Sequence, residues 1–329
     1  ASYSNPTYDP NPLASHDTNF ASDVFTLLNA APDQPALQRS WREIYPPGST
    51  FKVVTTGIGL ESVLTPEGGE PYRLTVDNPV YPELRELELP LTDRTLRNFG
   101  DSECGGALAQ SFRESCNTTF GQIGLDLGEG LARGIENYGL NVPPPDSDLR
   151  PGIVASRGPE QGTFETEAPL FAQAAIGQAD VAVTPLGMAM AAQAVANGGV
   201  MMVPHVLSHV TNSDGQEVPN SRYDVREYRR AMEPTTATTV RDLMVDVVNN
   251  GTGRGGQIPG IQVAGKTGTA QVAGEDPHAW FIAFAPADNP VYAISVLVEN
   301  GGDLGSEATG GRVAAPIAAA VLGGLLGAG

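Results

Sequence analysis

The stretch Tyr45-Pro-Pro-Gly-Ser-Thr-Phe-Lys-Val53 contains one of only two lysines among the 19 basic residues of the chain. The other lysine, Lys266, lies within Ala264-Gly-Lys-Thr-Gly-Thr269. All remaining basic residues are arginines, so a simple surface charge would be expected to be arginine here too. The two lysines therefore indicate positions that need either a base able to lose its proton or a compact ammonium group.

Ser49 and Lys52 are expected to share the first turn of a helix that begins at the Pro-Pro-Gly turn. Residues three apart on a helix lie on the same face, and a partly buried lysine can become neutral and accept a hydroxyl proton. Arginine cannot do so, because its guanidinium stays protonated. The helix start would also direct its positive dipole end at a developing oxyanion. By itself, however, Ser-x-x-Lys is a weak pattern, and a helix cap followed by a solvated lysine would explain it more simply.

Length and charge limit the classes of protein and partner. A chain of 329 residues can form one large unit or two closely packed units. The net charge of −19 argues against nucleic acid or an anionic membrane surface as the main partner. The first residues lack the basic flank and apolar core of a signal peptide, so we expect an excised piece of a longer protein. The apolar run from Val313 to Leu326 is short for a membrane span and predicts a terminal helix packed on a sheet.

Helix signals dominate the middle of the chain. Thr184 is a suitable N-cap, Pro185 occupies the first helical position and Gly198 can end the same helix. The further expected helices cover residues 107–112 and 237–249. The two glycines after Lys52 weaken the helix expected there, so burial would have to hold it.

The pattern changes to strands after residue 260. Three β-rich segments separated by short turns predict an antiparallel meander over residues 261–272, 280–285 and 291–298. The fold class is therefore expected to be α+β (mixed). Its sheet-containing part would cover about residues 1–60 and 250–329, and its mainly helical part about residues 61–249. A cleft between the two parts is the natural place for a site.

Cys104 and Cys116 cannot form a zinc site alone, since no CxxC pair or nearby histidine supplies further ligands. They can be either a disulfide pair or two buried thiols. Among the histidines, we expect structural or surface roles for His16, His205 and His209. His278 is expected to steady the start of a strand.

Two further segments carry possible chemistry. On a strand, Thr267 and Thr269 would point to one side and Lys266 to the other, while the glycines Gly265 and Gly268 leave room for another backbone. Such an edge could accept an extended peptide and gather its carboxylate with hydroxyls and a cation. Between the two lysines in sequence lies Ser115-Cys-Asn117, whose hydroxyl could relay a proton and whose amide could hold a carbonyl.

These three segments have the order of the SxxK, SxN and KTG motifs, so the chain resembles the penicillin-binding proteins and serine β-lactamases. Further stretches are similar to class B penicillin-binding proteins, and the resemblance covers essentially the whole chain. The arginine bias suggests an actinobacterial member. The similar stretches are Tyr8-Asp-Pro-Asn11, Tyr45-Pro-Pro-Gly48, Gly177-Gln178 with Thr184-Pro-Leu186, Gly251-Thr252 and His278-Ala-Trp-Phe281.

The resemblance implies a peptidoglycan D,D-transpeptidase that cross-links stem peptides through a serine acyl-enzyme and is acylated by β-lactams. It makes Ser49 the nucleophile, Lys52 its base and Ser115 the proton relay, helped by the field of Lys266. Neither a metal nor an organic cofactor is expected. The residues implied to bind substrate are Asn117, Thr267, Gly268 and Thr269, and the backbone N–H groups of Ser49 and Thr269 would form the oxyanion hole.

The family fold is a five-stranded antiparallel sheet flanked by helices, with an all-helical subdomain. In the family, the first strands precede the Tyr8-Asp-Pro-Asn11 stretch, and almost nothing precedes it here. The sheet is therefore expected either to be incomplete or to have early strands on a missing N-terminal piece. The family's anchor and accessory domain are also expected to be missing.

The resemblance also implies a location and partners. It places the protein at the outer face of the cytoplasmic membrane, with a membrane glycosyltransferase of the shape or division type as partner and no nucleic acid. There the cysteines would be disulfide-bonded. The remaining alternatives are a β-lactam-hydrolysing enzyme, a D,D-carboxypeptidase and a non-catalytic cell-wall sensor or scaffold.

Overall fold

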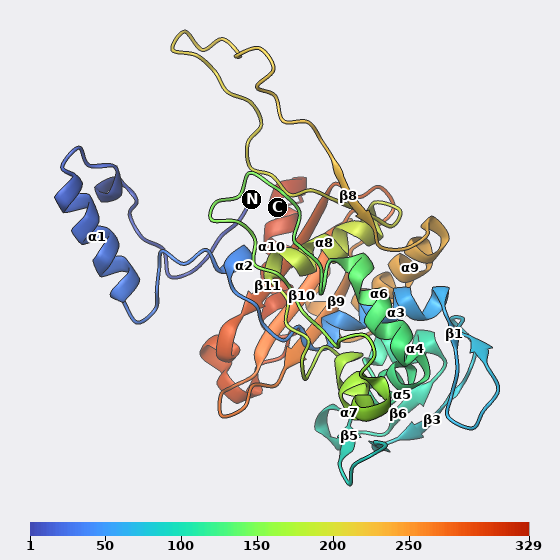
Figure 1. The fold of residues 1–329 in the computed structure, drawn as a ribbon. Helices are drawn as coiled ribbons and strands as arrows, with labels where there is room; N and C mark the ends of the chain where they lie inside the picture. The colour runs from blue at the N-terminus through green and yellow to red at the C-terminus, as the bar shows by residue number, and fades with distance from the viewer. Residues whose placement is uncertain (329) are drawn as a thin grey trace.

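The computed structural model describes residues 1–328 (Figure 1). Ten α-helices lie within these residues: α1 (Thr18–Ala30), α2 (Arg39–Arg42), α3 (Lys52–Glu61), α4 (Leu108–Glu114), α5 (Asn117–Leu127), α6 (Glu129–Ile135), α7 (Phe164–Ala174), α8 (Pro185–Ala196), α9 (Pro234–Asn250) and α10 (Ala314–Leu326). A 3-10 helix over Gly48–Phe51, which contains Ser49, leads directly into α3. The strands are β1 (Val63–Leu64), β2 (Tyr72–Arg73), β3 (Tyr81–Leu84), β4 (Glu86–Glu88), β5 (Thr95–Arg97), β6 (Cys104–Gly106), β7 (Val200–Met202), β8 (Glu227–Arg230), β9 (Ala264–Ala270), β10 (His278–Ala285) and β11 (Tyr292–Val298).

The main sheet is the predicted antiparallel meander, with strand order β11-β10-β9. The central strand β10 is buried along its whole length. Because successive side chains of a strand point to opposite faces, Trp280 and Ile282 join the core of the helical part while Phe281 and Ala283 join a second core beneath α10. The expected C-terminal helix therefore does pack on the sheet. The sheet has three strands in residues 1–328, where the family pattern has five.

Helix α3 runs through the centre of the molecule, and residues 52–59 are all buried. Its two glycines are sites of close approach: a Cβ at Gly57 would lie 2.0 Å from the hydroxyl of Tyr138, and one at Gly59 3.0 Å from Leu74. Burial thus stabilises a helix whose own propensity is low, as expected.

Helix α8 begins as predicted, because the Thr184 hydroxyl accepts a hydrogen bond of 2.9 Å from the Gly187 N–H. Helix α9 starts earlier than expected, at Pro234, which occupies the first helical position.

The middle part, which was expected to be mainly helical, also contains short strands. Four two-stranded sheets lie there, formed by β1 with β2, β3 with β6, β4 with β5, and β7 with β8. Their strands have two to four residues. Such short segments show no readable alternation of polar and apolar residues, so only their packing against the helices determines them.

Across residues 1–328, no helix combines the length and the apolar character that a bilayer crossing requires.

Candidate active site

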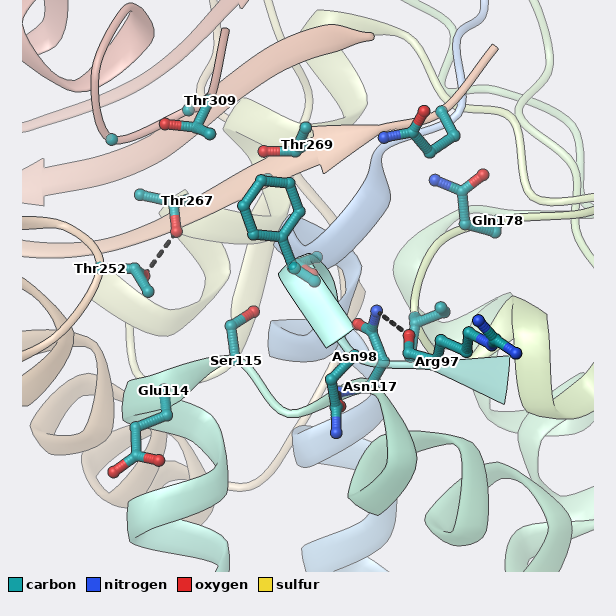
Figure 2. A pocket seen from close by; sticks show the side chains of 18 of the residues that line it. Arg97, Asn98, Glu114, Ser115, Asn117, Gln178, Thr252, Thr267, Thr269 and Thr309 are labelled. Atoms are coloured by element: carbon teal, nitrogen blue, oxygen red, sulfur yellow. Dashed lines mark hydrogen bonds between the residues drawn. The ribbon is translucent and has the colours of Figure 1, made fainter. Parts of the chain in front are cut away.

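A cleft of about 760 Å³ opens between the helical part and the edge strand β9 (Figure 2). Ser115, Asn98 and Asn117 lie on its helical side and face Thr267 and Thr269 on the strand side. The cleft thus joins the three predicted motifs. Its lining residues are Ser49, Leu96, Arg97, Asn98, Phe99, Gly100, Glu114, Ser115, Asn117, Gln173, Ile176, Gln178, Thr252, Thr267, Gly268, Thr269, Gln271, Thr309, Gly310 and Gly311.

Ser49 reaches this cleft because two glycines let its turn press against β9. Gly48 has a φ of +54°, and a Cβ there would lie 2.7 Å from the carbonyl oxygen of Thr269. A Cβ at Gly268 would lie 2.7 Å from the carbonyl oxygen of Pro47. The Gly48 N–H also donates to Gly177 at 2.9 Å. Side chains at these positions would force the serine turn and the strand apart.

Both lysines are fully buried, and their ammonium groups meet at the hydroxyl of Ser115. Lys266 Nζ donates to Ser115 Oγ at 2.9 Å, and Lys52 Nζ lies 3.2 Å from the same oxygen. Lys52 Nζ also donates to the Ser115 carbonyl at 2.6 Å and to Asn117 Oδ1 at 2.8 Å. The Ser115 hydroxyl can therefore carry a proton between the two amines.

The environment favours one neutral and one charged lysine. Burial, followed by the positive charge of Lys266, holds the pKa of Lys52 well below its ordinary value. Burial alone lowers the pKa of Lys266 to about 7. Lys52, which is subject to both burial and the neighbouring charge, is therefore the amine that we expect to be neutral and to act as the base. An aromatic ring lies near each amine, Phe112 at 5.7 Å from Lys266 Nζ and Phe120 at 5.3 Å from Lys52 Nζ, so these contacts do not distinguish the two lysines.

The strand residues are arranged as the alternation predicted. Thr267 and Thr269 line the cleft, and the Thr267 hydroxyl is 2.6 Å from that of Thr252. In the sequence, Thr252 belonged only to a stretch similar to the family. The structure adds that its hydroxyl is hydrogen-bonded to the hydroxyl of Thr267, a predicted substrate-binding residue. The Lys266 side chain instead turns into the protein toward Ser115.

The side chain of Asn117 is occupied by protein partners. Its Oδ1 accepts from Lys52, and its Nδ2 donates to the Arg97 carbonyl at 2.9 Å. Sequence reasoning missed both Arg97 and its neighbour Asn98, which also line the cleft. No motif marks them, because they lie about twenty residues before Asn117 and reach it only through folding.

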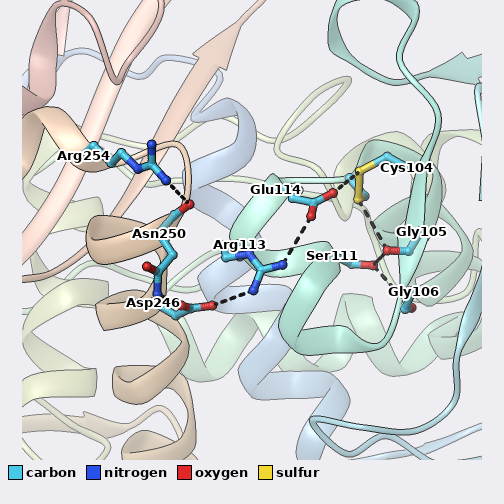
Figure 3. Close-up of polar contacts among 10 residues, drawn as sticks. Cys104, Gly105, Gly106, Ser111, Arg113, Glu114, Asp246, Asn250 and Arg254 are labelled. Atoms are coloured by element: carbon cyan, nitrogen blue, oxygen red, sulfur yellow. Dashed lines mark hydrogen bonds and ion pairs between the residues drawn. A yellow bond between two sulfur atoms is a disulfide. The ribbon is translucent and has the colours of Figure 1, made fainter.

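Cys104 and Cys116 form a disulfide with a Cα–Cα distance of 5.4 Å, which settles the alternative between a bond and two thiols (Figure 3). The bond attaches β6 to the residue between Ser115 and Asn117. These cysteines and Glu114 are the one group of possible metal ligands found in residues 1–328, and both sulfurs are engaged with each other.

His278 lies at the start of β10, where its Nδ1 accepts a 3.0 Å hydrogen bond from the Asn300 N–H. Its ring packs edge to face on Tyr45 at 5.6 Å. These contacts fit the expected role in steadying the strand start. His205 stacks on Tyr223 away from the cleft.

Residues 1–323 match the family model described as penicillin binding protein transpeptidase domain. The chain is 40% identical over 98% of its length to a peptidoglycan D,D-transpeptidase, PbpA, of Mycolicibacterium smegmatis. It is also 40% identical over 97% of its length to PbpA of Mycobacterium tuberculosis. The chain spans about 63% and 62% of the lengths of these two relatives, respectively.

A solved structure of a related protein has the same fold. The penicillin G acyl-enzyme complex of penicillin-binding protein A from M. tuberculosis superposes with a TM-score of 0.83 at 36% identity. The match covers 98% of this chain and 71% of that one. The expected similarity to actinobacterial proteins of this type is confirmed.

Proposed function

Because the chain belongs to the penicillin-binding protein transpeptidase family, we propose that it is a peptidoglycan D,D-transpeptidase that β-lactams acylate at Ser49. The observation that carries the proposal is the meeting of two buried lysines at one hydroxyl, beside a serine held against an edge strand. This arrangement supplies a nucleophile, a base, a proton relay and a cation without further groups.

Acylation begins with proton transfer from the Ser49 hydroxyl to neutral Lys52. The Ser49 oxygen attacks the carbonyl carbon of the penultimate D-alanine, and the backbone N–H groups of Ser49 and Thr269 stabilise the resulting oxyanion. The C–N bond then breaks. The proton on Lys52 passes through Ser115 Oγ to the leaving amine of the terminal D-alanine, which leaves an ester on Ser49.

Cross-linking repeats these steps in reverse with a second stem peptide. Its amine attacks the ester carbonyl and loses a proton through the same relay, and the Ser49 oxygen leaves and regains its proton. A new amide bond forms, so no net redox change or external proton is required. A β-lactam would undergo only the acylation step. The amine freed when its ring opens remains attached to the acyl group on Ser49.

The donor peptide is proposed to lie along β9 as an added strand, since β9 is an edge of the main sheet. Thr267, Gly268 and Thr269 would supply backbone pairing and hydroxyls, and the charge of Lys266 would attract the terminal carboxylate. The two threonine hydroxyls already line the cleft, which supports this orientation.

The whole protein is proposed to work at the outer face of the cytoplasmic membrane, anchored by an N-terminal segment and paired with a membrane glycosyltransferase. Family membership supports this proposal, because peptidoglycan cross-links form outside the cytoplasm.

Incubation with a fluorescent penicillin tests the function. The wild type should be labelled covalently at Ser49, and the Ser49→Ala variant should not. Rapid loss of the label would instead indicate a β-lactamase, and absence of labelling in the folded wild type would indicate a non-catalytic sensor. With a D-Ala-D-Ala peptide, release of D-alanine without a cross-linked product in the presence of an acceptor amine would indicate a carboxypeptidase.

A further inference from the structure

The segment Ser115-Cys116-Asn117 is a short connection between α4 and α5 with an unusual local structure. Ser115 adopts the left-handed conformation, with φ +65° and ψ 41°. Cys116 occupies the N-cap position of α5 but makes no side-chain capping hydrogen bond, because its sulfur belongs to the disulfide. The first N–H groups of α5 therefore need an acceptor from elsewhere.

Asn98 provides that acceptor from a distant part of the chain. Its Oδ1 accepts from the Asn117 N–H at 2.7 Å and from the Thr118 N–H at 3.1 Å. Its Nδ2 donates to the Leu84 carbonyl at 2.7 Å and to the Ser102 carbonyl at 3.1 Å. One amide thus joins the start of α5 to two backbone segments, the end of β3 and the residues just before β6.

The surroundings make this amide hard to replace. Asn98 is 5% exposed, so water cannot readily take over its hydrogen bonds. The adjacent Arg97 carbonyl accepts from Asn117 Nδ2, while Asn117 Oδ1 accepts from Lys52. A shift at Asn98 would therefore change both the backbone and the side chain of Asn117, and with them the partners of the base.

We propose that Asn98 is the positioning residue that holds Ser115 and Asn117 within reach of the two lysines. The Asn98 side chain caps α5 in place of Cys116, whose side chain makes no capping hydrogen bond, and it fixes the direction in which α5 starts. Asn98 acts through Asn117 and does not itself transfer a proton. The inference deepens the proposed function and rests on it, since acylation is one of its measures.

The experiment compares Asn98→Ala with Asn141→Ala in the chain described here. Asn141 serves as the control, because its side-chain amide makes three hydrogen bonds to backbone groups, against four for Asn98, and it lies outside the cleft. Asn141 is exposed, whereas Asn98 is buried. Asn98→Ala should slow acylation by fluorescent penicillin about 100-fold, the scale of a misplacement near 1 Å. At long times the variant should still bind nearly one penicillin per protein molecule. This end point distinguishes slow acylation of a folded protein from the presence of a misfolded fraction. Asn141→Ala should acylate at the wild-type rate.

Asn98→Asp keeps the acceptor for the two N–H groups but sets its second oxygen against the Leu84 and Ser102 carbonyls. Recovery of part of the lost rate is therefore expected only where this carboxyl is protonated and its O–H can donate to one of these carbonyls. Hydrogen exchange of a peptide covering residues 115–120 gives a measure that does not depend on activity. Exchange there should rise in Asn98→Ala and stay unchanged in Asn141→Ala.

Wild-type acylation by Asn98→Ala, equal slowing in Asn141→Ala, or unchanged exchange at residues 115–120 would each overturn the inference. If the wild type is not acylated at all, the proposed function fails, and the exchange measurement still decides whether Asn98 positions the segment.

Discussion

Replacing Lys52 with arginine separates basicity from charge. The Lys52 side chain is fully buried, and its Nζ lies 2.6 Å from the Ser115 carbonyl and 2.8 Å from Asn117 Oδ1. A guanidinium would place a permanent positive charge and several donors at this position but could not accept a proton from Ser49. We therefore expect Lys52→Arg to acylate far more slowly than the wild type.

The expected loss is the contribution of a general base, about 10²- to 10⁴-fold. At 1.36 kcal/mol for each factor of ten, this is about 3–5 kcal/mol of activation free energy. Lys266→Arg should lose less, about tenfold, because its proposed role is a cation beside Ser115 Oγ and a guanidinium preserves that charge. Lys52→Arg should thus acylate about 10- to 1,000-fold more slowly than Lys266→Arg.

The measurement is the second-order rate constant for acylation by a fluorescent penicillin, with folding checked by thermal melting. Lys52→Met, which is unbranched and neutral, controls for the size of the arginine side chain and should be equally slow. If folded Lys52→Arg acylates within about twofold of the wild type, Lys52 is not the base and the proposed mechanism is wrong.

Three other predictions concern the cation, the cross-link and the cleft hydroxyls. Acylation requires a charged Lys266, whose pKa is about 7, so the second-order rate constant should fall as the pH rises through this region. Lys266→Arg should remove that alkaline decline, and a decline unchanged in the variant would assign it to another group. Replacing Cys104 and Cys116 by serine opens a loop of sequence separation 12 and should lower the unfolding free energy in urea by up to about 3 kcal/mol. An unchanged free energy would show that the bond does not restrain the unfolded chain. Thr252→Val should raise the KM for a D-Ala-D-Ala peptide by up to about tenfold, because the buried Thr267 hydroxyl loses its hydroxyl partner, and a KM equal to that of the wild type would exclude this role.

The sequence predicted the elements whose signals are local. Ser49 and Lys52 lie in one turn, Thr184 caps the helix that follows it, and alternation along β9 sends Thr267 and Lys266 in different directions. Each of these relations spans a few residues, so helix or strand geometry alone determines it.

Relations between distant segments could not be predicted in this way. The cap that Asn98 gives to α5 crosses 19 residues, and the choice between a disulfide and two thiols depended on where β6 lies. The short strands of the middle part likewise depend on neighbours that only the folded chain brings together. The residues that hold the motifs in place were therefore missed, while the motifs themselves were found.

The two lysines explain why the site needs such positioning. Burying two ammonium groups within reach of one hydroxyl would be strongly unfavourable if both stayed charged, so the folded protein favours release of one proton. Which lysine stays charged depends on small differences in their surroundings, because both are fully buried. Asn117 and the Ser115 carbonyl surround Lys52 with acceptors, and a neutral amine can still donate to them while its lone pair is free for a proton. The placement of the Ser115–Asn117 segment therefore determines the hydrogen-bond partners of Lys52.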